Sequence, residues 1–162
     1  MVLGTVTVSG SPCTGGVGNL PGTLCQRFFV GGLGNVPIEV ELRITDPVIA
    51  PIGTVLMSSG GDGTGFYADL PGGERLLTDL VAAGFRVVDR RWLTGWFTTG
   101  EGFLQQSGRY ATLVTWVHDN LQIGPAFCVS GNSAGGMRSV ATIFARPFAV
   151  GKPSVKMTAS PG

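Results

Sequence analysis

The chain has 162 residues, of which 43% are hydrophobic and only 13% charged, so it is long enough for one domain with a hydrophobic core. Its 27 glycines and 10 prolines follow no fixed period, which excludes collagen, and the low charge argues against a disordered polyelectrolyte. Eleven basic and ten acidic side chains leave a net charge of +1, so we expect no nucleic acid or anionic membrane surface as a partner. No apolar run reaches the roughly 18 residues that span a bilayer, so we expect no transmembrane segment.

Periodicity and turn residues predict the elements in chain order. Strands are predicted at residues 3–10, 35–47, 53–59, 85–92 and 125–131, and helices over a stretch from Leu76 to Val81 that Gly84 ends, at about 104–121, and from Met137 to Phe144. Within the strand at 35–47, Ile38, Val40 and Leu42 alternate with charged side chains. From residue 53 onward strands alternate with helices. This order predicts an α/β fold, with a mostly parallel sheet and helices on both of its faces.

We expect a single domain over residues 1–162. Its N-terminal part, residues 1–50, is predicted to be rich in β-structure, and βα units are predicted to follow at 51–146. Residues 147–162 are expected to form a tail or to begin a further strand, for which the segment SVKMTA at 154–159 is the candidate.

Two of the three cysteines flank a glycine-rich segment. Cys13 and Cys25 enclose TGGVGNLPGTL, which has little core of its own, so a disulfide that closes this loop is the favoured interpretation. A disulfide indicates a secreted or periplasmic protein, although residues 1–12 do not have the pattern of a signal peptide. The alternative is a pair of reduced, unrelated thiols in a cytosolic protein. Cys128 lies in the apolar run PAFCVSG and is expected to act as a small buried hydrophobic residue.

Two glycine-rich segments follow predicted buried strands. Gly131 to Gly135 read GNSAG and fit the pattern G-x-S-x-G, which places a serine at a sharp, strained turn from a strand into a helix. Such a turn brings backbone close to backbone and requires small neighbours, which the sequence supplies after Ser133. The second segment, Gly60 to Thr64, reads GGDGT and follows the strand predicted at 53–59.

With these residues the chain resembles the α/β-hydrolase family, over residues of about 36–145. In that family one backbone N–H of the oxyanion hole comes from a glycine-rich loop after an earlier strand, and the other comes from the residue after the nucleophile. The resemblance implies that Ser133 is the nucleophile and that Ala134, with Gly61 or Asp62, forms the oxyanion hole. It implies hydrolysis of a small-molecule ester or amide through an acyl-enzyme, with no cofactor and no metal.

The sequence departs from the family in its acid and base. The family's chain order is serine, acid, histidine, but residues 134–162 contain no Asp, Glu or His. The single histidine, His118, lies in the helix before Ser133, where we expect it to decorate a helix end beside Asp119. Because a serine without a base is a poor nucleophile, this chain is expected to be weak or inactive. It resembles the N-terminal portion of a hydrolase, incomplete at the C-terminus.

Two other functions are compatible with the residues. The segment GGDGT resembles the phosphate-binding signature of the diacylglycerol kinase and NAD kinase superfamily, in which Asp62 would serve catalysis or bind a metal. The missing acid and base favour a non-catalytic binding or structural module stapled by the disulfide. The consecutive residues Asp89, Arg90 and Arg91 are interpreted as a structural ion-pair cluster.

Overall fold

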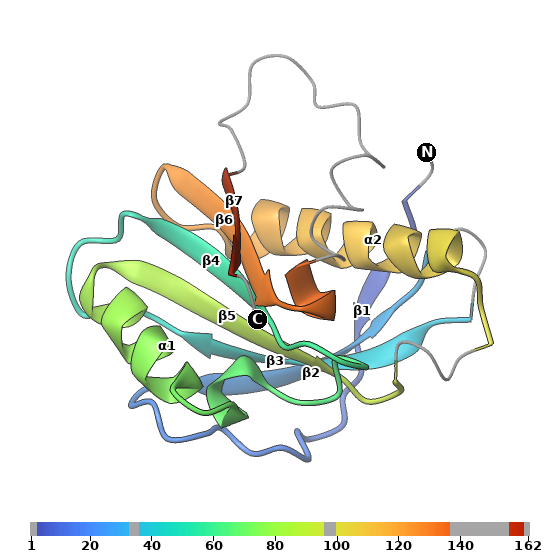
Figure 1. Cartoon of the computed structure of the whole chain (residues 1–162), viewed down its shortest axis with the longest axis horizontal. Coiled ribbons are helices and arrows are strands. Elements are labelled where there is room, and N and C mark those ends of the chain that lie inside the picture. Colours follow the sequence, from blue (N-terminus) through green and yellow to red (C-terminus); the bar gives the residue numbers. More distant parts are fainter. Residues whose placement is uncertain (1–2, 33–35, 96–99, 137–155, 161–162) are drawn as a thin grey trace.

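The computed structural model describes residues 3–32, 36–95, 100–136 and 156–160 (Figure 1). Within them seven strands form one sheet in the order β1-β2-β3-β5-β4-β6-β7. The strands are β1 Val6–Val8, β2 Leu24–Val30, β3 Ile38–Thr45, β4 Gly53–Ser58, β5 Phe85–Trp92, β6 Ala126–Asn132 and β7 Lys156–Ser160. The helices are the short 3₁₀ helix η1 Tyr67–Asp69, α1 Gly73–Ala82 and α2 Phe103–Leu121.

The sheet is mixed, and its two halves differ in direction. Pairing is antiparallel from β1 through β2 and β3 to β5. From β5 through β4 and β6 to β7 it is parallel. The α/β class is therefore confirmed, and the parallel half coincides with the part in which strands and helices alternate in the sequence. The antiparallel half comes from the N-terminal strands.

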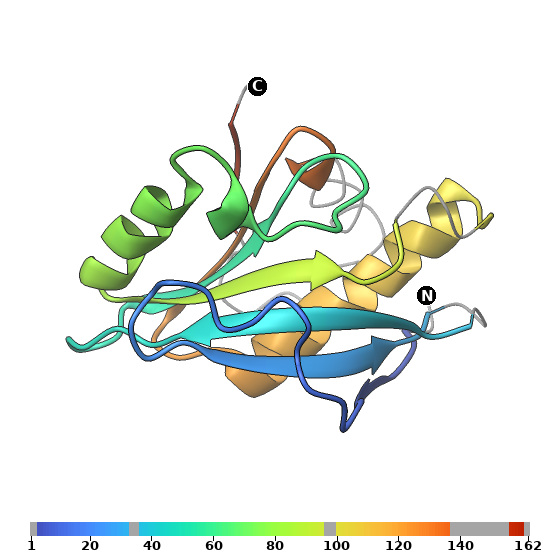
Figure 2. The same ribbon diagram turned by 90° about the horizontal axis from the view of Figure 1, so that it is seen from below.

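Helices cover both faces of the sheet, as predicted (Figure 2). On one face α1 packs Leu77 against Val55, Met57 and Val87. On the other face α2 contributes to the larger core, whose strand residues include Leu56. The neighbouring residues of β4 belong to different cores because successive side chains of a strand point to opposite faces.

The predicted bounds hold best where a turn residue fixes them. The strand predicted at 85–92 matches β5, and Gly84 lies just after α1 with a φ of 97°, a conformation that glycine adopts without strain. The segment expected to begin a further strand contributes β7, at 156–160. The helix predicted from Met137 to Phe144 lies outside the described residues, and the three residues before it, 134–136, are helical.

The strand β2 was not predicted, and it explains why the N-terminal part of the sheet is larger than expected. Its residues Phe28 and Val30 lie in the larger core, whereas Phe29 between them is exposed, as expected for successive residues of a strand. The strand begins just before Cys25, so one end of the glycine-rich segment is part of the sheet. The other end is tied to it by the Cys13–Cys25 disulfide.

The glycine-rich segment covers the polar face of β3. The Glu41 carboxylate accepts hydrogen bonds from the backbone N–H groups of Thr14 at 2.7 Å and Gly15 at 3.2 Å, and it pairs with Arg91 at 2.9 Å. The guanidinium of Arg43 donates to the carbonyl oxygen of Gly15. Both Glu41 and Arg43 are buried, although polar residues that alternate with apolar ones in a strand commonly face solvent. Desolvation by burial alone would raise the pKa of Glu41, but its hydrogen bonds with Thr14, Arg91 and Gly15 outweigh this effect and lower the pKa.

The disulfide closes a loop with a sequence separation of 12, and in the entropy model a loop of this size contributes about 3 kcal/mol to stability. We expect Cys13→Ala/Cys25→Ala to lower the free energy of unfolding by about that amount, measured by urea denaturation. Cys128→Ala is the matched control, because it removes a thiol that is not in the disulfide. A reductant should destabilise the wild type and leave the double variant unchanged. An equal response of both would contradict the prediction.

Candidate active site

Ser133 lies at the turn between β6 and the helical residues 134–136. Its φ is 46°, and it is the only non-glycine residue with a positive φ in the part of the chain that the structure describes. The left-handed region costs an L-residue roughly 1–2 kcal/mol, so the backbone here is strained. The Ser133 side chain is exposed, and its carbonyl oxygen accepts a hydrogen bond from the N–H of Gly136 at 2.9 Å.

The glycines at both ends of GNSAG are required by a close approach of two backbones. A Cβ atom at Gly131 would lie 2.7 Å from the carbonyl oxygen of Ser58, and one at Gly135 would lie 2.6 Å from the same oxygen. Contacts this short do not occur for real Cβ atoms. The G-x-S-x-G spacing therefore has a physical cause in this chain: the turn around Ser133 is packed against the end of β4.

The second glycine-rich segment lies next to this turn. β4 and β6 are parallel neighbours that pair Ser58 with Gly131, so the loops that follow both strands leave the same edge of the sheet. A Cβ atom at Gly60 would lie 3.2 Å from the Cβ of Ser133. The structure thus brings together two segments that are about 70 residues apart in the sequence, and the edge where they meet is the place where open α/β sheets bind ligands.

The glycine loop, defined as residues 59–65, begins with a tight turn. The N–H of Gly63 donates to the carbonyl oxygen of Gly60 at 3.0 Å, and both Gly61 and Gly63 have positive φ values. Gly61 is exposed and Asp62 is partly exposed. The two candidate N–H donors of this loop therefore belong to a turn whose first residue packs against Ser133.

His118 is remote from Ser133. It lies in the last turn of α2, where its Nδ1 is 2.7 Å from Oδ1 of Asp119, and its ring packs edge-on against Phe127 at 5.2 Å between centroids. Phe127 precedes Ser133 by six residues of extended chain, which span about 20 Å. The expectation that His118 decorates a helix end beside Asp119 agrees with this geometry. The described residues place no other imidazole near Ser133, since the chain has one histidine.

The residues Asp89, Arg90 and Arg91 do not form a single ion-pair cluster, which corrects the interpretation of the sequence. Only Arg91 of the three is in an ion pair between described residues, with Glu41. Asp89 accepts hydrogen bonds from the backbone N–H groups of Tyr67 at 2.8 Å and of its neighbour at 2.9 Å, so it holds η1. The alternation of β5 places Arg90 on the opposite face of the sheet from Asp89 and Arg91, and those two have different partners.

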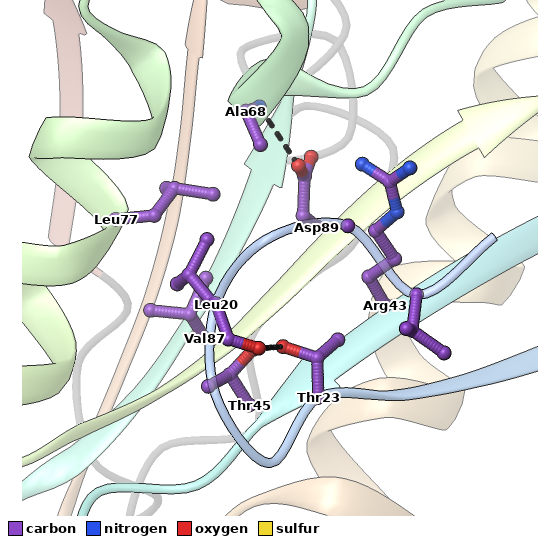
Figure 3. A pocket seen from close by; sticks show the side chains of 10 residues that line it. Leu20, Thr23, Arg43, Thr45, Ala68, Leu77, Val87 and Asp89 are labelled. Atoms are coloured by element: carbon purple, nitrogen blue, oxygen red, sulfur yellow. Dashed lines mark hydrogen bonds between the residues drawn. The ribbon is translucent and has the colours of Figure 1, made fainter. Parts of the chain in front are cut away.

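A small cavity lies beside Asp89, between the glycine-rich N-terminal segment and α1 (Figure 3). Its volume of about 10 Å³ is space for a single water molecule and not for a substrate. Thr23 and Thr45, which line it, share a hydrogen bond of 2.6 Å. Burial raises the pKa of Asp89 to about 6, against the opposing effect of its two backbone hydrogen bonds.

One cluster of potential metal ligands occurs among the described residues, formed by Cys13, Cys25 and Glu41. Both of its sulfur atoms are in the disulfide, so they are not thiolates that can bind a metal. None of the described helices is long and apolar enough to cross a bilayer.

The chain was compared with known proteins. No protein-family model and no curated protein sequence matches it. Among solved structures, it is similar to brefeldin A esterase, a bacterial homologue of human hormone sensitive lipase, with a TM-score of 0.55, 25% identity, and coverage of 78% of this chain and 37% of the esterase. It is also similar to a bacterial heroin esterase, with a TM-score of 0.52, 22% identity, and coverage of 80% of this chain and 42% of that esterase.

The acetyl xylan esterase 1 from Thermoanaerobacterium sp. JW/SL YS485 gives a TM-score of 0.53 at 17% identity, over 87% of this chain and 49% of that one. The chain has an α/β-hydrolase fold. These neighbours are esterases of that fold, which supports the resemblance to the α/β-hydrolase family. The chain spans less than half the length of each of the three structures.

The raised pKa of Asp89 predicts a pH dependence of stability. Below about pH 4 its carboxyl is protonated in both the folded and the unfolded state, whereas between pH 4 and 6 the unfolded chain loses the proton first. Asp89 therefore lowers the free energy of unfolding as the pH rises through that window, by about 3 kcal/mol in total.

We expect Asp89→Asn to remove this fall, measured as the difference between wild-type and variant urea denaturation from pH 4 to 7. Asp46→Asn is the matched control, because Asp46 is an exposed carboxylate on the surface and pairs with Arg86. A constant difference between wild type and Asp89→Asn over the whole range would contradict the prediction.

The backbone strain at Ser133 predicts an unusual order of stabilities. Ser133→Gly is expected to be more stable than Ser133→Ala by about 1 kcal/mol, because glycine adopts a positive φ without a Cβ clash. Both variants lose the same hydroxyl, so the alanine variant is the control for that loss. Thermal or urea denaturation measures the difference. Equal stabilities would mean that the turn carries no strain.

Proposed function

We propose that the chain carries the nucleophile of an esterase-like serine hydrolase, with Ser133 as that nucleophile in a nucleophile elbow. The observation that carries the proposal is the positive φ of an exposed serine between a buried parallel strand and a helical turn. Strain of this kind is found where function requires a particular side-chain direction. The fold of the esterases to which the chain is similar supports the same assignment.

The oxyanion hole of the proposed site consists of the backbone N–H of Ala134 with that of Gly61 or Asp62. Ala134 follows the nucleophile and begins the helical turn, where N–H groups have no helical partner. The glycine loop would supply the other N–H donor, since Gly60 packs against Ser133 and Gly61, which follows it, is exposed. Losing one donor of this kind typically costs about 3 kcal/mol of transition-state stabilisation.

In the proposed reaction the Ser133 Oγ attacks the carbonyl carbon of an ester or amide, and its proton passes to a base. The C–O or C–N bond of the tetrahedral intermediate then breaks, the leaving group takes up a proton, and an acyl-enzyme remains. Water hydrolyses the acyl-enzyme to a carboxylic acid and regenerates the serine.

The proposed reaction needs a base that accepts the Ser133 proton. His118 packs against Phe127, which precedes Ser133 by about 20 Å of extended strand, and no acid or histidine follows Ser133 in the sequence. We therefore propose that this chain acylates slowly with activated substrates, with little turnover. The disulfide supports a secreted or periplasmic location, because disulfides persist in oxidising compartments.

A fluorophosphonate probe tests the assignment, because it reacts with an activated serine and needs no turnover. We expect labelling of one residue, Ser133, identified by peptide mass spectrometry, and no labelling of Ser133→Ala. Ser130→Ala is the matched control, since it changes a serine of the same strand that lies before the turn. Equal labelling of the wild type and Ser133→Ala would remove Ser133 as the nucleophile.

The same protein tests the phosphate-binding alternative for GGDGT. Calorimetric binding of a nucleotide that Asp62→Asn abolishes would replace the hydrolase proposal with the kinase-like one. The absence of both labelling and nucleotide binding would leave the non-catalytic module as the function of this chain.

A further inference from the structure

Arg90 is a buried cation that forms no ion pair between the described residues, and its burial needs an explanation. It is fully buried near the end of β5, with its guanidinium carbon 5.2 Å from the ring of Tyr110 and 5.4 Å from that of Trp92. No ion pair between the described residues includes it, and burial lowers the pKa of its guanidinium. A buried charge without a direct ion pair is expensive, typically by several kcal/mol, so its retention needs a specific reason.

The hydrogen bonds of Arg90 supply that reason, because they join the residue before the glycine loop to a residue within it. Nε donates to Oγ of Ser58, the residue before the loop, at 3.1 Å. Nη1 lies 3.4 Å from the carbonyl oxygen of Gly63, which also accepts a bond of 2.8 Å from the N–H of Trp92. The Ser58 hydroxyl is in turn 2.7 Å from the hydroxyl of Tyr110, so the network is anchored in α2.

The chemistry of the guanidinium suits this task. Its donors form a rigid, planar fork that can reach two acceptors at once, whereas a lysine ammonium is a point charge on a flexible stem. Two nitrogens of Arg90 are used in this way, and Nη2 has no partner among the described residues.

We propose that Arg90 is the positioning residue of the glycine loop, which it holds through Ser58 and Gly63 so that the loop N–H groups face Ser133. This inference rests on the proposed function. The loop cannot shift alone, because the carbonyl oxygen of Ser58 lies against Gly131 and Gly135, on both sides of the nucleophile. Arg90 therefore acts on the oxyanion hole without touching a substrate.

Two measurements on full-length variants test the inference. The first is hydrogen exchange of the amides at 60–65, which we expect to be at least about tenfold faster in Arg90→Met because the loop opens locally. The second is the rate of fluorophosphonate labelling as a function of probe concentration. An oxyanion hole acts on the transition state, so the limiting rate constant should fall about 100-fold while the half-saturating concentration stays unchanged.

Arg90→Lys separates positioning from charge. It keeps the positive charge and loses the fork, so we expect it to behave like Arg90→Met in both measurements. Full rescue by lysine would overturn the inference, because charge alone would then suffice. Arg109→Met is the matched control: Arg109 is an equally buried arginine that pairs with Glu101 and has no hydrogen bond to residues 59–65 among the described contacts.

Milder variants keep the test decisive if Arg90→Met does not fold. Tyr110→Phe and Ser58→Ala each remove one hydroxyl of the network, and each should accelerate exchange in the loop and slow labelling in the same direction. Unchanged exchange at 60–65 in a folded Arg90 variant overturns the inference even if the wild type is labelled. An unlabelled wild type instead overturns the proposed function, and the exchange data then decide the role of Arg90 separately.

Discussion

The contact between the end of β4 and the turn after β6 is the constraint on which the rest of the candidate site depends. The carbonyl oxygens of Ser58 and Ser59 lie where a side chain on Gly131 or Gly135 would have to be. Because both positions are glycine, the two strand ends approach closely enough for Gly60 to pack against Ser133. A methyl group at either glycine would push the strand ends apart and would separate the glycine loop from the serine.

Much of the fold could be predicted because local patterns and tertiary structure agree there. β5 follows a glycine that ends α1, and Leu77, taken as part of a helical apolar face, is buried in the core that α1 shares with β4 and β5. The polar side of β3 could not be predicted in this way. Alternation predicts that Glu41 faces solvent, but the N-terminal segment covers it and satisfies its carboxylate with N–H groups and an arginine. Only the tertiary path of that segment decides the outcome.

In the candidate site, too, some features could be predicted from the sequence and others could not. The glycine–serine pattern predicted the position of Ser133, because the spacing itself reflects the backbone contact that the turn requires. Arg90 was missed as a separate feature, since a run of Asp, Arg and Arg on a strand suggests charges that pair with one another. The period of two in a strand prevents this, because it places Asp89 and Arg90 on opposite faces. Applied to the run of Asp89, Arg90 and Arg91, this periodicity indicates that Arg90 lies apart from Asp89, on the other face of the sheet.

Three unfavourable features lie along the same edge of the sheet, and their clustering is itself informative. Ser133 has a strained backbone, Arg90 is a buried cation without an ion pair, and Asp89 is a desolvated carboxyl. Each lowers stability locally, and two of them hold other segments: Asp89 holds η1, and Arg90 holds Ser58 and Gly63 beside the turn at Ser133. Proteins tolerate such departures mainly where function requires a fixed geometry. Their position at one edge of the sheet therefore supports the proposed site at Ser133.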